Sequence, residues 1–384
     1  MEIVQKRAFL LGGIALLLGI PGMIMRTEAF FRCYLFAYVF WIGFPLGCLA
    51  VLMLHHLVSG RWGYAVQRIM EAGAETMPLM ALLFIPVLFG LGALFPWVHG
   101  QGADGALESR GWDAYLNPRF FVVRAAVYFG IWITAGTWLS KWSRNQDQTA
   151  DPLLARKMRL LSAPGLILYA LATTFASIDW VMSLEPGWSS TIFGLIFVVG
   201  QVLSALAFAI IALRVLRKLP PLSSVLTTTH FHHLGNLLLA FVILWAYVAY
   251  SQFIIIWSGN LPDENIWYIH RSGGWAGLAI VVIIAHFFVP FLLLLSRRTK
   301  RAIGILSTIA AGILVMHLAD VYWIIMPSFY PGTVHIQWLD ITMPLGIGGL
   351  WFGAFVARLR GKPLLALHDP RFPVMAERAR TGTP

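Results

Sequence analysis

The chain has few of the residues that bind redox centres or solvate a soluble domain. Cys33 and Cys48 are its only cysteines, too few for a Cys₄ iron–sulfur site, and neither begins a CxxCH haem-attachment motif. Charged residues make up 12% of the chain, against about 25% in an average soluble protein. The P-loop and HExxH patterns are missing too. We therefore expect this chain to hold no metal or redox cofactor of its own.

Long apolar runs dominate what is present, because 59% of the 384 residues are hydrophobic. A helix needs roughly 20 apolar residues to cross a bilayer. The sequence therefore predicts an all-α, multi-pass integral membrane protein with about ten transmembrane helices. The expected segments are 8–25, 31–58, 65–97, 119–140, 159–183, 188–215, 235–258, 274–296, 302–326 and 336–357.

The net charge of +11 would suit nucleic acid, but the distribution of the basic residues indicates a membrane topology instead. Of the 28 Lys and Arg residues, 22 lie in the two tails and the even-numbered connections, and 5 lie in the odd-numbered ones. Cytoplasmic loops of membrane proteins carry this excess. We expect both termini, including the tail 361–384, to be cytoplasmic and no nucleic acid to bind.

The predicted helices divide into groups along the chain. Segments within 31–183 form a first four-helix bundle and those within 188–326 a second one, with peripheral helices at 8–25 and 336–357. The segment 65–97 is too long for one simple crossing; its amphipathic first part could lie at the cytoplasmic interface, and Pro78 should kink or restart the helix. In the last segment, Gly346, Gly349 and Gly353 favour close packing on another helix.

Four motifs resemble a known family. They are YLFAYVFWIGFPLGCLAVLMLHHL at 34–57, FASIDWVMSLEPGWSSTIFG at 175–194, HFHHLGNLLLAFVILWAYVAYSQFIIIWSGNLP at 230–262 and MHLADVYWIIMP at 316–327. Together they resemble the ActF-type membrane subunits of bacterial alternative complex III, within the wider NrfD/PsrC-like family of quinone-interacting membrane proteins. The resemblance spans nearly the whole chain.

The resemblance implies a bacterial inner-membrane complex that oxidises quinol, such as menaquinol, in a respiratory or photosynthetic electron transport chain. It implies a sister NrfD-like membrane subunit, an iron–sulfur subunit and multihaem cytochrome c subunits as partners, besides lipid. Haem and iron–sulfur clusters would then lie in those partners, while this chain gives structural support and a proton path. Quinol itself is a possible ligand of this chain.

Titratable residues inside the apolar segments are the candidates for a proton path, because polar groups at membrane depth are costly unless they face protein or water. In the outer half, His317 and Asp320 are three residues apart and share a helix face. The alternative interpretation is structural, with Arg124 paired to Asp179 or Asp340. The outer candidates are Asp179, Tyr247, Tyr250, His317, Asp320 and Asp340.

The inner candidates are His55, Glu71 and Glu75, with His286 as a link between the two halves. Glu71 and Glu75 share a face four residues apart, although Arg68 could instead be an ordinary helical partner of Glu71. A haem between helices is disfavoured because His286 and His317 are expected at different depths. Two rival functions stay open, a secondary transporter and a pure scaffold subunit whose buried charges are all paired.

Overall fold

The computed structural model describes residues 1–99, 114–366 and 369. In this part of the chain all regular structure is helical, and ten helical stretches are long and apolar enough to span a membrane, which confirms the predicted fold class. The outer connection around 100–113 and most of the predicted cytoplasmic tail 361–384 lie outside the described residues.

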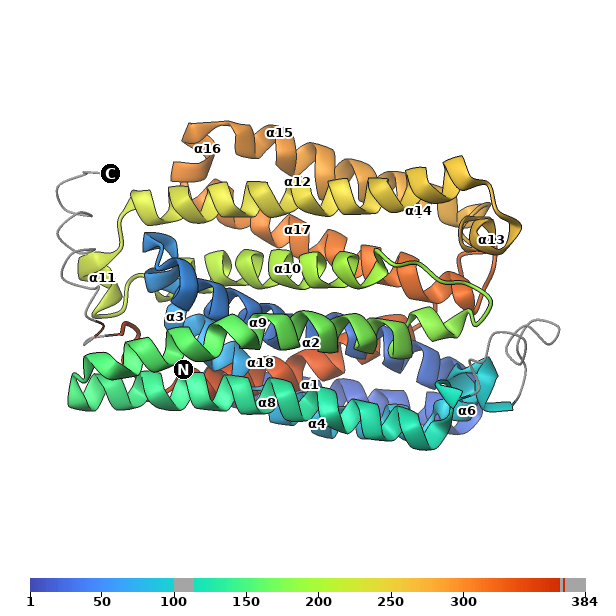
Figure 1. Ribbon diagram of the computed structural model, residues 1–384, viewed down its shortest axis with the longest axis horizontal. Coiled ribbons are helices and arrows are strands. Elements are labelled where there is room, and N and C mark those ends of the chain that lie inside the picture. Colours follow the sequence, from blue (N-terminus) through green and yellow to red (C-terminus); the bar gives the residue numbers. More distant parts are fainter. Residues whose placement is uncertain (100–113, 367–368, 370–384) are drawn as a thin grey trace.

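The long helices form one elongated bundle (Figure 1). Their bounds are α1 Glu2–Met25, α2 Thr27–Val58, α3 Arg61–Ala74, α4 Met77–Leu83, α8 Pro118–Thr149, α9 Pro152–Trp180, α10 Phe193–Leu216, α12 Thr228–Gly259, α14 Gly274–Val282, α15 Val289–Leu295, α17 Ile303–Ile325 and α18 Leu339–Leu359. Short helices are α5 Ile85–Phe89, α6 Leu91–Leu94, α11 Leu222–Val225, α13 Pro262–His270 and α16 Arg297–Arg301. Three-residue or four-residue 3₁₀ turns cover Pro96–His99, Met182–Leu184 and Met326–Ser328.

The start of the first helix and the end of the last helix lie at the same end of the bundle. Glu2 at the start of α1 forms an ion pair of 3.0 Å with Arg360, which follows α18. The basic connections, including α11 and α16, lie at this end, and α13 and the turn before α18 lie at the other (Figure 1). From the distribution of Lys and Arg we expect the first end to be cytoplasmic, and we call it the inner end and the other the outer end.

The centre of the bundle is the contact between α2 and α10, which carry the most buried apolar windows of all the spans. Gly47 permits this contact, because a Cβ there would lie 2.0 Å from the carbonyl oxygen of Gln201. Around this centre, α8 packs on α9, and α10 packs on both α12 and α17. Polar residues on α2, α10 and α17 are thereby enclosed by protein rather than lipid.

Helices α1 and α18 pack closely on each other. A Cβ at Gly349 would lie 2.5 Å from the Cα of Gly12, and one at Gly346 or Gly353 would lie 2.6 or 2.9 Å from a side chain of α1. The prediction that the glycines of the last helix provide a close-packing face is therefore confirmed.

The third predicted segment is broken, as its length and prolines indicated. Helix α3 ends at Ala74, and α4 restarts with Pro78 in its first turn. That the amphipathic first part lies at the cytoplasmic interface stays a prediction, but this part is not exposed on the surface of the protein. Gln67, Arg68 and Glu71 are all buried, because α3 packs against α2, α8, α10 and α18.

Candidate functional site

Three titratable side chains from two helices meet inside the second half of the chain. His286 comes from the span that begins with α14, and His317 and Asp320 come from one face of α17. One ligand-type atom from each residue lies within 4.8 Å of the others, and all three residues are buried. We call these three residues the His286–His317–Asp320 cluster.

His286 lies in a π-helical turn, Ile283–Phe288, inserted between α14 and α15. Such turns add a residue to a helical turn and are frequent at functional sites. The side chain of His286 is fully enclosed, and neither ring nitrogen meets hydrogen-bond geometry with a described group, although the Ile313 backbone lies close enough to influence it. A buried imidazole without a firm partner is costly, so this position favours a water or another polar partner.

His317 connects His286 to Asp320. The His286 and His317 rings stack with centroids 5.8 Å apart, and His317 Nδ1 lies 3.6 Å from Asp320 Oδ2. The latter distance is slightly longer than a hydrogen bond, so a small side-chain rotation would form or break it. The expectation that the two histidines lie at different depths is wrong, because the π-turn and α17 bring them side by side.

Neighbouring helices hold the cluster in place. Trp245 of α12 donates its Nε1 hydrogen to Asp320 Oδ2 at 3.2 Å. Its indole ring also packs against the His286 ring in a T-shaped arrangement, with ring centroids 4.4 Å apart. On α10, a Cβ at Gly200 would lie 2.8 Å from the His317 ring. The Phe40 ring of α2 contacts His317 as well. The cluster is therefore a packed polar site within an apolar shell.

This arrangement suits the holding and passing of a proton. Two imidazoles and a carboxylate offer adjacent groups that each accept or donate one proton, and the shell restricts exchange with bulk water. The same donor set could bind a transition-metal ion, whose ligand atoms sit about 2.0–2.2 Å from it. At that distance the ligand atoms would lie roughly 3.4 Å apart, so the cluster would have to contract to hold such an ion.

Asp179 is part of an ion pair and not of this cluster. Arg124 Nε and one terminal nitrogen donate to its two carboxylate oxygens at 2.8 and 2.9 Å, and Tyr128 donates to it at 2.8 Å. Both partners are buried. The arrangement matches the structural interpretation, in which Arg124 fixes α8 against the end of α9.

Asp340 lies at the start of α18, apart from Arg124. It accepts hydrogen bonds from the Gln337 backbone at 2.9 Å, the Tyr322 hydroxyl at 3.2 Å and the Cys33 thiol at 3.0 Å. Tyr322 follows Asp320 by two residues on α17. Asp340 therefore belongs to a separate polar site, beside the outer end of α17.

The two inner glutamates are both in ion pairs. Glu71 pairs with Arg68 at 2.6 Å, and Glu75 pairs with Lys362 at 2.6 Å and with Arg144. Their placement agrees with the alternative that Arg68 is a helical partner of Glu71. His55 is buried at the inner end of α2 against Gly63, where a Cβ would lie 2.0 Å from its Nδ1.

Tyr247 and Tyr250 do not reach the cluster. They are 66% and 64% exposed on the outward face of α12, opposite to the face that carries Trp245. Their hydroxyl groups predicted a position in the polar interior of the protein, but the helical phase of α12 directs both side chains towards lipid or another subunit. Neither tyrosine is therefore part of a proton path through the cluster.

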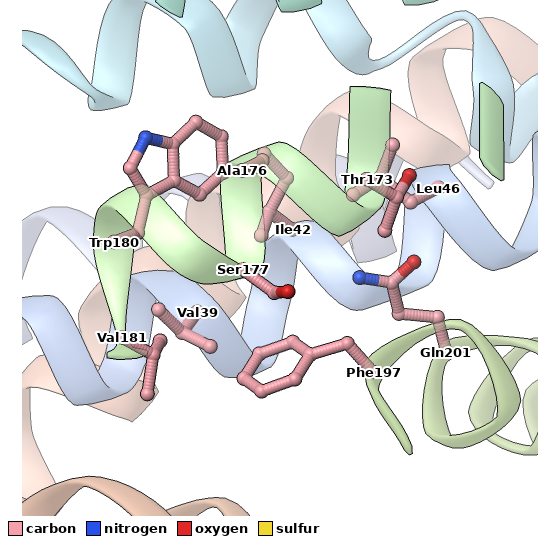
Figure 2. A pocket seen from close by; sticks show the side chains of 10 residues that line it. All are labelled: Val39, Ile42, Leu46, Thr173, Ala176, Ser177, Trp180, Val181, Phe197 and Gln201. Carbon is pink, nitrogen blue, oxygen red and sulfur yellow. The ribbon is translucent and has the colours of Figure 1, made fainter. Parts of the chain in front are cut away.

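A small cavity lies between α2, α9 and α10, beside the centre of the bundle. Its volume of about 10 Å³ is room for roughly one water molecule. Figure 2 shows Thr173, Ser177 and Gln201 around this space, together with Trp180 and Phe197. A quinone ring has eight non-hydrogen atoms in its smallest form, so this cavity is too small to bind one.

The sequence reasoning missed a second buried network at the outer end. Glu185, just beyond the fifth span, accepts from Arg271 at 3.0 Å and from Ser328 at 2.6 Å, and His270 Nδ1 lies 3.2 Å away. Arg271 also lies over the Trp267 ring. The signal was available, because Glu185 and Arg271 stand in outer connections that hold few charges.

The charges of this network persist at neutral pH. Burial lowers the pKa of Arg271 to about 10, even though Glu185 opposes that change. Burial favours the neutral form of Glu185, but the hydrogen bonds from His270, Arg271 and Ser328 outweigh it and hold the pKa below its ordinary value of 4.5. The pair therefore fastens the loop after α9 to α13 and to the end of α17.

Comparison with known proteins adds no family assignment. No protein-family model matches the chain, and no curated protein is significantly similar to it.

Proposed function

We propose that this chain is a multi-pass subunit of a quinol-oxidising complex in the bacterial inner membrane, of the alternative complex III type. In this proposal it transfers protons through the His286–His317–Asp320 cluster, while electrons pass through partner subunits. The observation that carries the proton role is the burial of two adjacent histidines and an aspartate in an apolar shell, where charge without function is costly.

The quinol-oxidising context rests on the four motifs, and three of them contribute residues to one site. The motif at 316–327 supplies His317 and Asp320, and the motif at 230–262 supplies Trp245. The motif at 34–57 supplies Phe40, which lies against His317. Segments distant in the sequence thus carry their distinctive residues to one place.

The proposed partners follow from the same resemblance. A sister NrfD-like membrane subunit and an iron–sulfur subunit would oxidise quinol, and multihaem cytochrome c subunits would receive the electrons. Proton transfer here would then respond to quinol oxidation in the sister subunit. Within the chain, Asp340 and Tyr322 at the outer end of α17 offer the next polar groups beyond Asp320.

A scaffold role is the second candidate, and specific contacts favour it. Asp179 and Glu75 lie in ion pairs with basic residues of neighbouring segments. Glu71 pairs with Arg68 of its own helix, and Arg68 in turn pairs with Asp147 of α8. Ion pairs of this kind hold helices in register and carry no protons. The cluster differs from them because none of its members contacts a basic side chain of Lys or Arg among the described residues.

The test is Asp320→Asn in the purified complex, reconstituted into sealed vesicles. Asparagine keeps the size and still accepts the Trp245 hydrogen bond, but it cannot titrate. We expect intact assembly and quinol oxidation with fewer protons released per electron. Glu28→Gln, which changes an exposed carboxylate far along the chain from the cluster, serves as the control and should leave that ratio unchanged. An unchanged ratio in an assembled Asp320→Asn complex would leave the scaffold role as the better account.

Purification of the same complex also tests the proposed membership of a quinol-oxidising complex. The chain should co-purify with iron–sulfur and multihaem subunits and with a second membrane subunit of its own type. Recovery as a stable homo-oligomer that transports a solute would instead support the transporter interpretation.

A further inference from the structure

A second cavity opens at the inner end of the bundle, and none of the cluster residues lines it. Its volume is about 430 Å³, within the range of sites that bind small molecules. The end of α10, helix α11, the start of α12 and the start of α17 enclose it. The lining residues are Arg217, Lys218, Ser223, Leu226, Thr227, Thr228, Phe231 and Ile303.

One wall of this cavity is basic and rich in hydroxyl groups. Arg217 and Lys218 both line it, none of the eight lining residues is acidic, and neither basic side chain forms an ion pair within the described part of the chain. Ser223 and Thr228 add hydroxyl donors. A guanidinium beside an ammonium and hydroxyls is the chemistry that recognises phosphate.

The surrounding charge has the same sign. Helix α16, Arg297–Arg301, packs on α12 and directly precedes Ile303, and four of its five residues are basic. The first turn of α12 also faces this end, with Thr227 capping the backbone of His230. An anion in the cavity would therefore meet a uniformly positive environment.

Another part of the lining is an apolar wall formed by Leu226, Phe231 and Ile303. Phe231 and Ile303 lie near the inner ends of two membrane-spanning stretches, and Leu226 precedes the first of these. Val215 and Leu219, on the outside of the adjoining chain, are 71% and 41% exposed. A soluble phosphate would leave this apolar wall unused, whereas a phospholipid carries a phosphate and the start of its acyl chains at that depth.

We propose that this cavity binds the headgroup of an anionic phospholipid of the inner leaflet. Arg217 and Lys218 hold the phosphate, and Leu226, Phe231 and Ile303 contact the upper acyl chains. Basic pockets between transmembrane helices on the cytoplasmic side are known to bind anionic lipids in this way. The site does not depend on the proposed proton role.

The experiment measures binding of phosphatidylglycerol to the full chain, in the assembly with which it purifies, in neutral-detergent micelles. Each Lys or Arg near an anionic headgroup contributes about a fivefold change in affinity. We expect Arg217→Gln/Lys218→Gln to weaken phosphatidylglycerol binding on the order of 20-fold and to leave phosphatidylcholine binding unchanged. Arg217→Lys/Lys218→Arg should retain the preference, which shows that charge rather than folding is measured.

Two controls decide the source of the phosphate and the specificity of the site. Arg156 and Lys157 form another consecutive basic pair, exposed at the inner end of α9. An equal loss in Arg156→Gln/Lys157→Gln would mean general surface charge and would overturn the proposal. Displacement of the lipid by millimolar inorganic phosphate would identify a site for free phosphate instead. Unchanged binding in Arg217→Gln/Lys218→Gln would also refute it.

Discussion

Removal of Arg124 should destabilise the protein strongly, because it would leave Asp179 in the interior without a basic partner. The two side chains are 8% and 1% exposed, and the pair is bidentate. Breaking such a buried pair by removing one partner costs about 3–5 kcal/mol. Arg124→Ala also removes the hydrogen bond from Arg124 to the Tyr115 carbonyl oxygen at 2.6 Å and the cation–π contact with the Tyr115 ring.

Heating in detergent, followed by size-exclusion chromatography of the remaining folded protein, measures this effect. At about 2 °C per kcal/mol, the apparent melting temperature should fall by roughly 6–10 °C. Arg124→Met/Asp179→Leu should recover most of the loss, since replacing both charges with apolar residues removes the uncompensated one. Arg119→Ala, an exposed residue of the same helix, is the matched control. Equal melting temperatures for Arg124→Ala and Arg119→Ala would refute the anchoring role.

Three further predictions concern packing, pH and thiol access. Gly47→Ala should destabilise by about 1–3 kcal/mol because its Cβ would meet the Gln201 carbonyl, whereas Gly130→Ala, with open space around it, should not; equal melting temperatures would contradict the central α2–α10 contact. The stability that Glu185 provides relative to Glu185→Gln should be present above pH 4.5 and disappear as the pH falls through its lowered folded pKa, and a pH-independent difference between their melting curves would contradict this. Cys33 and Cys48 are fully buried, so a maleimide should label them only after denaturation, and rapid labelling of the native protein would show that one is accessible.

The number and type of helices could be predicted because hydrophobic length and the distribution of Lys and Arg act locally along the chain. The packing of Gly346 and Gly349 on α1 followed from the spacing of small residues. The pairing of Arg124 with Asp179 was one of two alternatives, and sequence could not choose between Asp179 and Asp340 because that choice depends on where α9 ends relative to α8.

The rest of the site depends on helix rotation and irregular backbone. Tyr247 and Tyr250 had suitable chemistry, but the phase of α12 directs them outward and Trp245 inward. The π-turn at His286 leaves no composition signal, yet it sets the depth and direction of that ring. Depth estimates that assume regular α-helix therefore separated His286 from His317.

The most direct test of the central claim follows the Asp320 carboxyl group itself during turnover. Infrared difference spectra of the quinol-oxidising complex, recorded in H₂O and D₂O, report a buried carboxyl that gains or loses a proton. The proposed function predicts a deuterium-sensitive carboxyl signal that appears on quinol oxidation, is lost in Asp320→Asn and persists in Glu28→Gln, which changes an exposed carboxylate. A turnover spectrum with the same carboxyl signals in the wild type and in Asp320→Asn would contradict it.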